Sequence, residues 1–183
     1  MLRVFDGLAR QKDLDLVLEL DSRINTDVLI DPLRFKQILS NLVSNAIKFT
    51  PMGRIKIALQ AVDNPDPQLL HLHITVQDSG IGISVEDQKR LFEPFAQADN
   101  TGQMARTGAG LGLVICRSLC MMMGGSLSLD SEPDNGTQIS MNLLLTTLEP
   151  LTMQPVATQP PAAVHQELRI LIVDDHPANR LLL

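Results

Sequence analysis

Three glycines at alternate positions, Gly108, Gly110 and Gly112, constrain this chain more than any other feature of its 183 residues. Glycine has no side chain to pack and loses the most backbone freedom on folding, so the run disfavours a strand or a helix interior. An apolar segment of helical length, Val114–Met123, follows and is ended by a Gly-Gly pair. The first N–H groups of a helix have no partner within it and lie at the positive end of its dipole. The run therefore predicts a turn that opens a helix and can bind phosphate.

Composition excludes several classes of function. The formal net charge of −6 has the wrong sign for a nucleic-acid binder, and a chain with no Trp or Tyr offers few stacking platforms. Apolar runs are too short to cross a membrane and no signal peptide is visible, so we expect a soluble, cytoplasmic protein. Cys116 and Cys120, four apart in the predicted helix, are typical of small core residues rather than a disulfide or zinc site.

A second helix is predicted from Asp31-Pro32, an N-cap followed by proline, to about Phe49, before Pro51 and Gly53. Helical spacing gives this helix two distinct faces. The core-facing stripe comprises Phe35, Leu39, Leu42, Val43 and Ala46, and another face carries Gln37, Asn41, Asn45 and Lys48. Amide oxygens suit a metal and a lysine suits phosphate, but an ordinary solvated face explains this pattern equally well.

Period-two alternation and turn residues predict the strands, and capping signals predict further helices. The strands are Leu14–Leu20, Val28–Ile30, Gly53–Val62, Leu70–Val76, Ser126–Leu129 and Thr137–Leu145, and the helices are Leu2–Ala9 and a short one from Ser84 to near Phe92. Asp134–Gly136 is the predicted hairpin turn. Ala96–Arg106 is polar and aperiodic, which indicates either a mobile lid over a phosphate site or a plain surface loop.

A carboxylate at a strand end, Asp78, is followed by Gly80 and Gly82. Glycines let a backbone approach a ligand and the carboxylate can accept from an amine or hydroxyl, although a single G-x-G is more often an ordinary turn. His71 and His73 share a strand face, and two histidines without a third ligand indicate a polar face rather than a metal site.

The C-terminal part changes in composition after residue 148. Residues 149–167 are rich in proline and poor in charge, which is typical of a linker. Leu168–Val173 is apolar, as in a buried parallel strand, and ends in the acidic pair Asp174 and Asp175. We therefore predict a domain over residues 1–148, a linker over 149–167, and the start of a second domain over 168–183.

Four sequence boxes, in this order, resemble those of the ATP-binding domain of sensor histidine kinases, within the wider GHKL group. In this chain, Asn41–Thr50 resembles the N box and Asp78–Gly82 resembles the first glycine box. Phe92–Phe95 resembles the F box, Gly108–Leu113 resembles the second glycine box, and Asn135–Thr137 is similar to a final Gly-Thr element. Each box alone is weak evidence, whereas the ordered set is specific. Pattern and resemblance together imply a two-layer α/β sandwich, the Bergerat-type ATP-binding fold, with a mixed, largely antiparallel sheet and helices on one face.

The resemblance also implies roles for individual residues. Asn45, with Asn41 beside it, would coordinate Mg²⁺ on the phosphates of ATP, and Lys48 would neutralise their charge. Asp78 would accept from the adenine amine, and Thr137 would lie near the same adenine edge. Phosphate contacts are expected from backbone of the second glycine box, and Arg106 is a further candidate. The ATP-binding set is completed by Gly80, Gly82, Gly108, Gly110, Leu111 and Gly112.

ATP-hydrolysing members of the group carry a glutamate where this chain has Asn41, so the resemblance favours phosphoryl transfer over hydrolysis. The acceptor histidine would lie on upstream dimerisation helices, and we expect the chain alone not to autophosphorylate. A nucleotide-sensing module without transfer and a GHKL hydrolase are the alternatives. The C-terminal tail resembles the opening of a receiver domain, where Asp174 and Asp175 would help bind Mg²⁺. This order implies a hybrid phosphorelay kinase, a membrane-bound homodimer as a whole, working with a receiver or response regulator.

Overall fold

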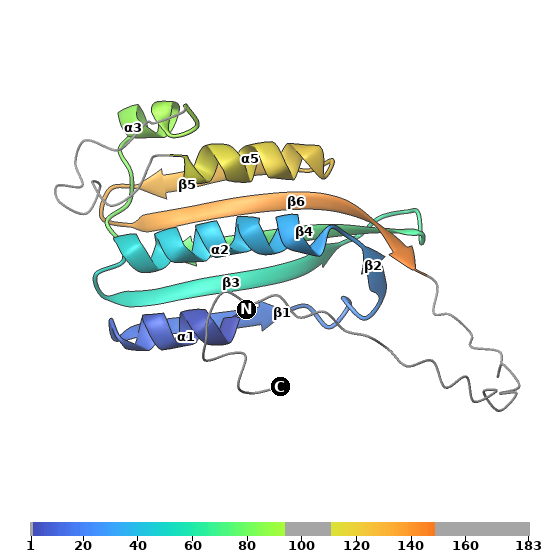
Figure 1. Ribbon diagram of the computed structural model, residues 1–183, viewed down its shortest axis with the longest axis horizontal. Helices are drawn as coiled ribbons and strands as arrows, with labels where there is room; N and C mark the ends of the chain where they lie inside the picture. Colours follow the sequence, from blue (N-terminus) through green and yellow to red (C-terminus); the bar gives the residue numbers. More distant parts are fainter. Residues whose placement is uncertain (1, 94–110, 149–183) are drawn as a thin grey trace, which may run out of the picture. The chain divides into compact units, whose positions relative to one another are not determined.

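The computed structural model describes residues 2–93 and 111–148, and within these ranges six strands form one sheet covered by helices on one face. The strands are β1 (Leu14–Leu20), β2 (Asp27–Leu29), β3 (Gly53–Val62), β4 (Leu69–Asp78), β5 (Ser126–Glu132) and β6 (Gly136–Leu148). The helices are α1 (Leu2–Arg10), α2 (Pro32–Phe49), α3 (Val85–Arg90) and α5 (Gly112–Met122). Figure 1 shows α1, α2 and α5 lying side by side over the sheet. The predicted two-layer α/β fold is confirmed.

The sheet order is β1-β3-β4-β6-β2, with β5 also paired to β6. Only β1 and β3 run parallel among these pairs, and the others are antiparallel, as predicted for a mixed sheet. The register places Ile55, Asp78 and Thr137 side by side at one end of the sheet. This alignment brings the predicted adenine residues Asp78 and Thr137 onto neighbouring strands.

The central helix α2 forms where its capping signals predict. The Asp31 carboxylate accepts from the N–H groups of Leu33 and Arg34 at 3.0 and 3.1 Å, and Pro32 occupies the first turn, where a proline costs no hydrogen bond. The buried stripe is wider than predicted. It contains Ile38, Leu39, Leu42, Val43, Ala46 and Ile47, while Phe35 is only partly buried. The added width arises because α2 packs on the sheet beneath it and against α1 and α5 at its sides.

Several predicted boundaries were wrong by a few residues. β2 begins one residue earlier than predicted, at Asp27, and β4 continues to Asp78 rather than ending at Val76. β5 and β6 likewise extend beyond the predicted Leu129 and Leu145. These extensions follow from strand pairing, which is non-local and leaves no periodic signal in the sequence.

The core lies between the sheet and the helical layer. Its fully buried side chains include Ile38, Leu42, Ile55, Ile57, Ile74, Met141 and Leu143. Cys116 and Cys120 are also fully buried, which confirms the prediction of small core residues. On the opposite face, Nδ1 of His73 and Oδ1 of Asn142 lie 2.7 Å apart, so this histidine belongs to a polar sheet face. Within the described ranges, no helix has the length and hydropathy needed to cross a membrane.

Candidate functional site

The amides of Asn41 and Asn45 lie against the first turn of α5. A Cβ added at Gly112 would be 3.9 Å from Nδ2 of Asn45 and 4.0 Å from Oδ1 of Asn41. One turn further along α5, the thiol of Cys116 is hydrogen-bonded by the Asn41 side chain, and its pKa is raised to about 11, chiefly by burial. The structure therefore brings the polar face of α2 and the start of the glycine-led helix together.

The C-terminal end of α2 is held by three other segments. The last four carbonyls of a helix have no partner within it. The carbonyl of Ala46 accepts from Thr50, from its N–H at 3.1 Å and from its hydroxyl at 2.7 Å. Nζ of Lys12 donates to the carbonyls of residues 47 and 48, and the N–H of Ile81 donates to that of Phe49 at 3.3 Å. All four carbonyls are thus satisfied.

The contacts of Lys12, Thr50 and Ile81 with α2 were missed by sequence reasoning. Thr50 directly follows the helix, and the following proline marks a helix end at this point. Lys12 is separated from its acceptors by more than thirty residues, and a solvated lysine near a turn carries no local signal of such a contact.

Asp78 lies at the end of β4 and is partly buried. Burial raises its pKa, and this effect is opposed by hydrogen bonds from the N–H groups of Gly80 and Thr137 and from the hydroxyl of Thr50. The Gly80 N–H lies 2.9 Å from Oδ1 of Asp78. Because the Thr50 hydroxyl has a single proton, it serves either Asp78 or the Ala46 carbonyl at one time. These hydrogen bonds therefore orient the Asp78 carboxylate, which can accept a further hydrogen bond, beside the C-terminal end of α2.

Close backbone contacts explain two glycines near Asp78. A Cβ at Gly80 would collide with the carbonyl oxygen of Phe49, and one at Gly136 would collide with that of Asp78. Gly136 also has φ 84°, in the left-handed region that favours glycine. The next residue, Thr137, has its hydroxyl 2.9 Å from Oγ of Ser131. Gly82 packs in a similar way against the carbonyl of Glu132.

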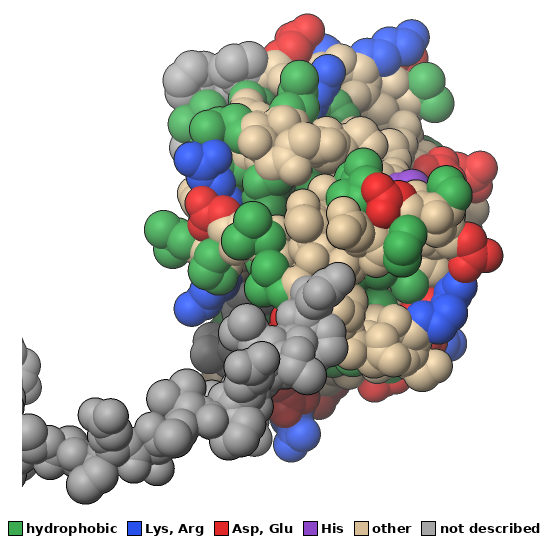
Figure 2. Space-filling view, turned by 90° about the vertical axis from the view of Figure 1, so that its right-hand side faces the viewer, with side chains coloured by type: hydrophobic (Ala, Val, Ile, Leu, Met, Phe, Trp, Pro, Cys, Tyr) green, Lys and Arg blue, Asp and Glu red, His purple; other side chains and the backbone are tan. Residues whose placement is uncertain are grey.

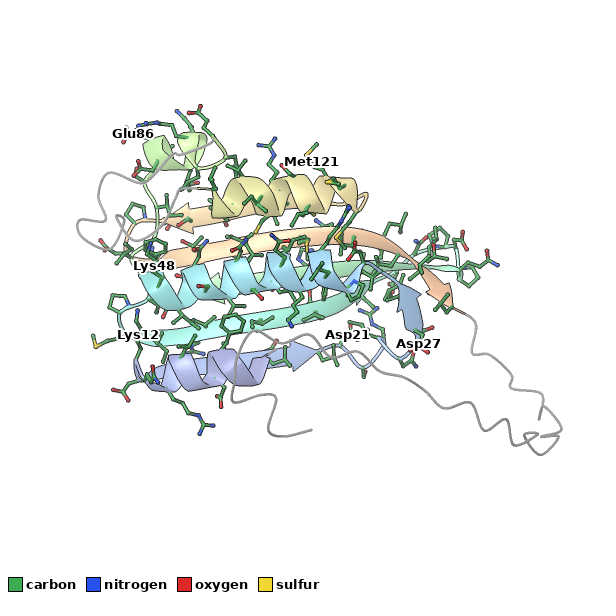
Figure 3. All side chains as sticks on the ribbon, in the orientation of Figure 1. Lys12, Asp21, Asp27, Lys48, Glu86 and Met121 are labelled. Atoms are coloured by element: carbon green, nitrogen blue, oxygen red, sulfur yellow. The ribbon has the colours of Figure 1, made fainter. Side chains whose placement is uncertain are left out.

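Lys48 lies on the last turn of α2 and is labelled in Figure 3. Its Nζ lies 4.6 Å from the centre of the Phe49 ring, and partial burial lowers its pKa. Near this end, the guanidinium carbon of Arg117 lies 5.2 Å from the centre of the Phe92 ring, which ties the F box to α5.

Some predicted site residues lie outside the described ranges. These are Arg106, Gly108 and Gly110, the candidate lid Ala96–Arg106, and the acidic pair Asp174 and Asp175. Leu111 is described and precedes α5 directly. The described part of the candidate site thus comprises two groups. In the first, Asn41 and Asn45 of α2 lie beside Gly112 of α5, and in the second, Asp78 of β4 lies beside Thr50, which follows α2.

Comparisons with known proteins identify the family to which this fold belongs. Residues 30–147 match the family model described as histidine kinase-, DNA gyrase B-, and HSP90-like ATPase. The virulence sensor protein BvgS of Bordetella bronchiseptica is 47% identical over all of this chain, which spans 15% of its length. The sensor protein EvgS of Escherichia coli K12 is 38% identical over 98% of the chain and 15% of its own length. The sensor histidine kinase GacS of Pseudomonas protegens is 43% identical over 78% of the chain and 16% of its length.

Solved structures show the same fold. Full-length ShkA in complex with AMPPNP matches with a TM-score of 0.67 and 28% identity, over 81% of this chain and 29% of that one. A nucleotide-free catalytic domain of the histidine kinase ThkA matches with a TM-score of 0.60 and 29% identity, over 77% of this chain and 84% of that one. The ordered boxes, the fold and these matches agree, and the chain belongs to the family of histidine kinase-, DNA gyrase B- and HSP90-like ATPases.

Proposed function

We propose that the chain binds Mg-ATP and supplies the γ-phosphoryl group that phosphorylates a histidine on upstream dimerisation helices, in a hybrid two-component phosphorelay. The observation that carries this proposal is the contact of Gly112 with the amides of Asn41 and Asn45. It places a helix start, which favours phosphate, beside two side-chain amides whose oxygens can bind magnesium. The family and the AMPPNP complex of ShkA support ATP as the nucleotide.

The side chains present fit a magnesium ion that arrives with its nucleotide. Mg²⁺ takes oxygen ligands and is usually held by one or two protein groups together with substrate phosphates and water. Asn45 would be the main protein ligand, with Asn41 beside it, and Lys48 would add a cation on the same helix. When bound, the ion would neutralise charge on the phosphates, and the chain itself would supply positioning.

Asp78 would bind the adenine. Its carboxylate accepts hydrogen bonds, and the exocyclic amine of adenine donates them, whereas guanine presents a carbonyl at that position. The N–H groups of Gly80 and Thr137 fix the orientation of the carboxylate. Partial burial strengthens any such bond, because water competes less for the same groups.

Position 41 favours transfer over hydrolysis. An asparagine amide cannot take a proton from an attacking water at neutral pH, so Asn41 cannot act as a general base. The γ-phosphoryl group would pass instead to an imidazole nitrogen of a histidine, with ADP as the leaving group. Within the described chain, His73 is engaged with Asn142 on the sheet face away from α2, which makes it a poor acceptor.

We also propose how this chain fits into a longer sensor kinase. The chain spans 15% of the length of BvgS and EvgS, whose names describe them as sensor proteins. We propose residues 149–167 as a linker and 168–183 as the start of a receiver domain, in which Asp174 and Asp175 would help bind Mg²⁺. The whole protein would be a membrane-bound homodimer with this part in the cytoplasm.

Incubation with ATP labelled on its γ-phosphate tests the proposal. We expect label on the upstream helices when they are mixed with the chain and Mg²⁺, and none on the chain alone. Strong labelling of the chain alone would contradict the assignment of the acceptor. Nucleotide binding without transfer would favour a sensing module, and release of free phosphate well above background would favour a hydrolase.

A further inference from the structure

Lys12 makes a long-range contact that no sequence box includes. Its Nζ donates to the carbonyl oxygens of Ile47 at 2.8 Å and Lys48 at 3.3 Å. Both acceptors belong to the last turn of α2, where carbonyls have no partner in the helix. One ammonium group thus satisfies two of the four terminal carbonyls, and Thr50 and Ile81 satisfy the others.

The backbone around Lys12 is firmly placed. The residue lies in the turn between α1 and β1, flanked by Ala9 and Leu14, which are 0% and 5% exposed. Asp13, the next residue, has φ 54°, which turns the chain sharply into β1. Figure 3 shows Lys12 and Lys48 at the same end of the molecule. Core packing of α1 and β1 therefore places the backbone of Lys12 within reach of the end of α2, and the two hydrogen bonds to the carbonyls position its ammonium group.

The electrostatic effect of this contact bears on an anionic ligand. The C-terminal end of a helix carries a partial negative charge, which repels phosphate, and a cation at that end offsets it. The last turns of α2 also carry Asn45 and Lys48, and Thr50 follows them. A shift of the last turn would move Lys48 and Thr50 directly, and it would alter the hydrogen bond from the Thr50 hydroxyl to Asp78.

We propose that Lys12 is a positioning residue for the nucleotide site: it fixes the last turn of α2 and offsets its negative end. This inference rests on the proposed binding of Mg-ATP. Lys12 acts through α2 and does not itself contact the nucleotide.

Affinity for Mg-ATP, measured by titration calorimetry on the full 183-residue chain, tests this role. Lys12→Met keeps most of the stem and removes charge and donors, whereas Lys12→Arg retains both. Lys36→Met is the control, because Lys36 is an exposed lysine on α2, the helix that Lys12 contacts, but lies in its N-terminal part. We expect Lys12→Met to weaken affinity roughly twofold to fivefold, the range for an exposed cation at a helix C-terminus. Lys12→Arg should restore most of it, and Lys36→Met should match the wild type.

All affinities are measured well below the unfolding midpoint of each variant, so that loss of folded protein does not imitate weak binding. NMR signals of the Asn45 side-chain amide give a second readout, and they should shift in Lys12→Met but not in Lys36→Met. Wild-type affinity in Lys12→Met, or loss that Lys12→Arg fails to restore, would overturn the positioning role and leave the proposed function standing. Absence of Mg-ATP binding by the wild type would overturn both.

Discussion

Asn45 is the side chain on which the proposed magnesium contact depends, and its substitution gives a first prediction. Asn45→Ala should weaken Mg-dependent ATP affinity by roughly tenfold to a hundredfold, because bonds to charged groups contribute about 1.5–3 kcal/mol each. Gln37→Ala, exposed on the same helix, should bind like the wild type. Calorimetric titration with and without Mg²⁺ measures both. Equal affinities for the two variants would contradict the role of Asn45.

Asp78 gives a prediction about pH. Its pKa is raised by burial, so its carboxylate becomes protonated at a higher pH than an ordinary aspartate on acidification. ATP affinity should therefore be full above this raised pKa and should fall as the pH drops through it, because the protonated group accepts poorly from the adenine amine. Asp78→Asn should bind weakly with no such pH dependence. If ATP affinity still falls on acidification in Asp78→Asn, a group other than Asp78 causes the pH dependence.

The sequence signals for the candidate site residues differ in strength. The spacing of Asn41 and Asn45 fits a ligand site and an ordinary solvated face equally well, and the glycines after Asp78 are weak evidence alone, so it was the ordered set of boxes that selected these residues. The structure places Asn41 and Asn45 on α2 and Asp78 at the end of β4. Lys12 and Thr50 could not be predicted, because their role lies in contacts with backbone carbonyls that any sequence would provide. The signal for such residues exists only in three dimensions.

Among the elements, α2, β1 and β3 form over the predicted residues, whereas the bounds of β2, β4, β5 and β6 differ from the prediction. Its start and end depend on Asp31, Pro32 and Pro51, which act locally on the backbone. The end of β4 depends instead on pairing of Asp78 with Thr137, two residues far apart in the chain. Local signals therefore predicted the helix that carries the candidate site, while the ends of β4, β5 and β6 followed from strand pairing.

Two glycines with positive φ, Gly124 between α5 and β5 and Gly136 at the start of β6, give a prediction about stability. Gly124 and Gly136 both have positive φ, 73° and 84°, but a Cβ would meet nothing within 4 Å at Gly124 and would collide with the Asp78 carbonyl at Gly136. Gly124→Ala should cost about 1–2 kcal/mol for the left-handed backbone alone. Gly136→Ala should cost clearly more. Urea unfolding measures both variants, and equal losses would show that the contact with Asp78 is not a tight one.

For the molecule as a whole, stability in acid should depend on the end away from the site. Arg23 pairs with Asp21 at 2.8 Å and with Asp63 at 2.8 Å. Figure 3 labels Asp21 at the end opposite Lys48, and Figure 2 views the molecule from that side, where charged and hydrophobic side chains are interspersed. This network joins the turn after β1 to the end of β3.

The pKa of Asp21 is lowered from 3.8 to about 2, chiefly by hydrogen bonds from Arg23. A lowered pKa means that the stabilising contribution is present above pH 3.8 and is lost as the pH falls through about 2. Asp21→Asn should therefore be less stable than the wild type above pH 3.8, with the difference shrinking toward pH 2. Thermal unfolding across this range measures it. A constant difference would contradict the ionic origin.

The central proposal for the whole molecule is that the polar face of α2 and the adjoining start of α5 together bind Mg-ATP. The most direct measurement is an NMR titration of the isotope-labelled chain with Mg-ATP. We predict saturable shifts at the backbone amides of Gly80 and Gly112 and at the side-chain amides of Asn41 and Asn45, with His73 on the opposite sheet face unchanged. Absence of saturable shifts, or shifts centred on the sheet face around His73, would contradict the account.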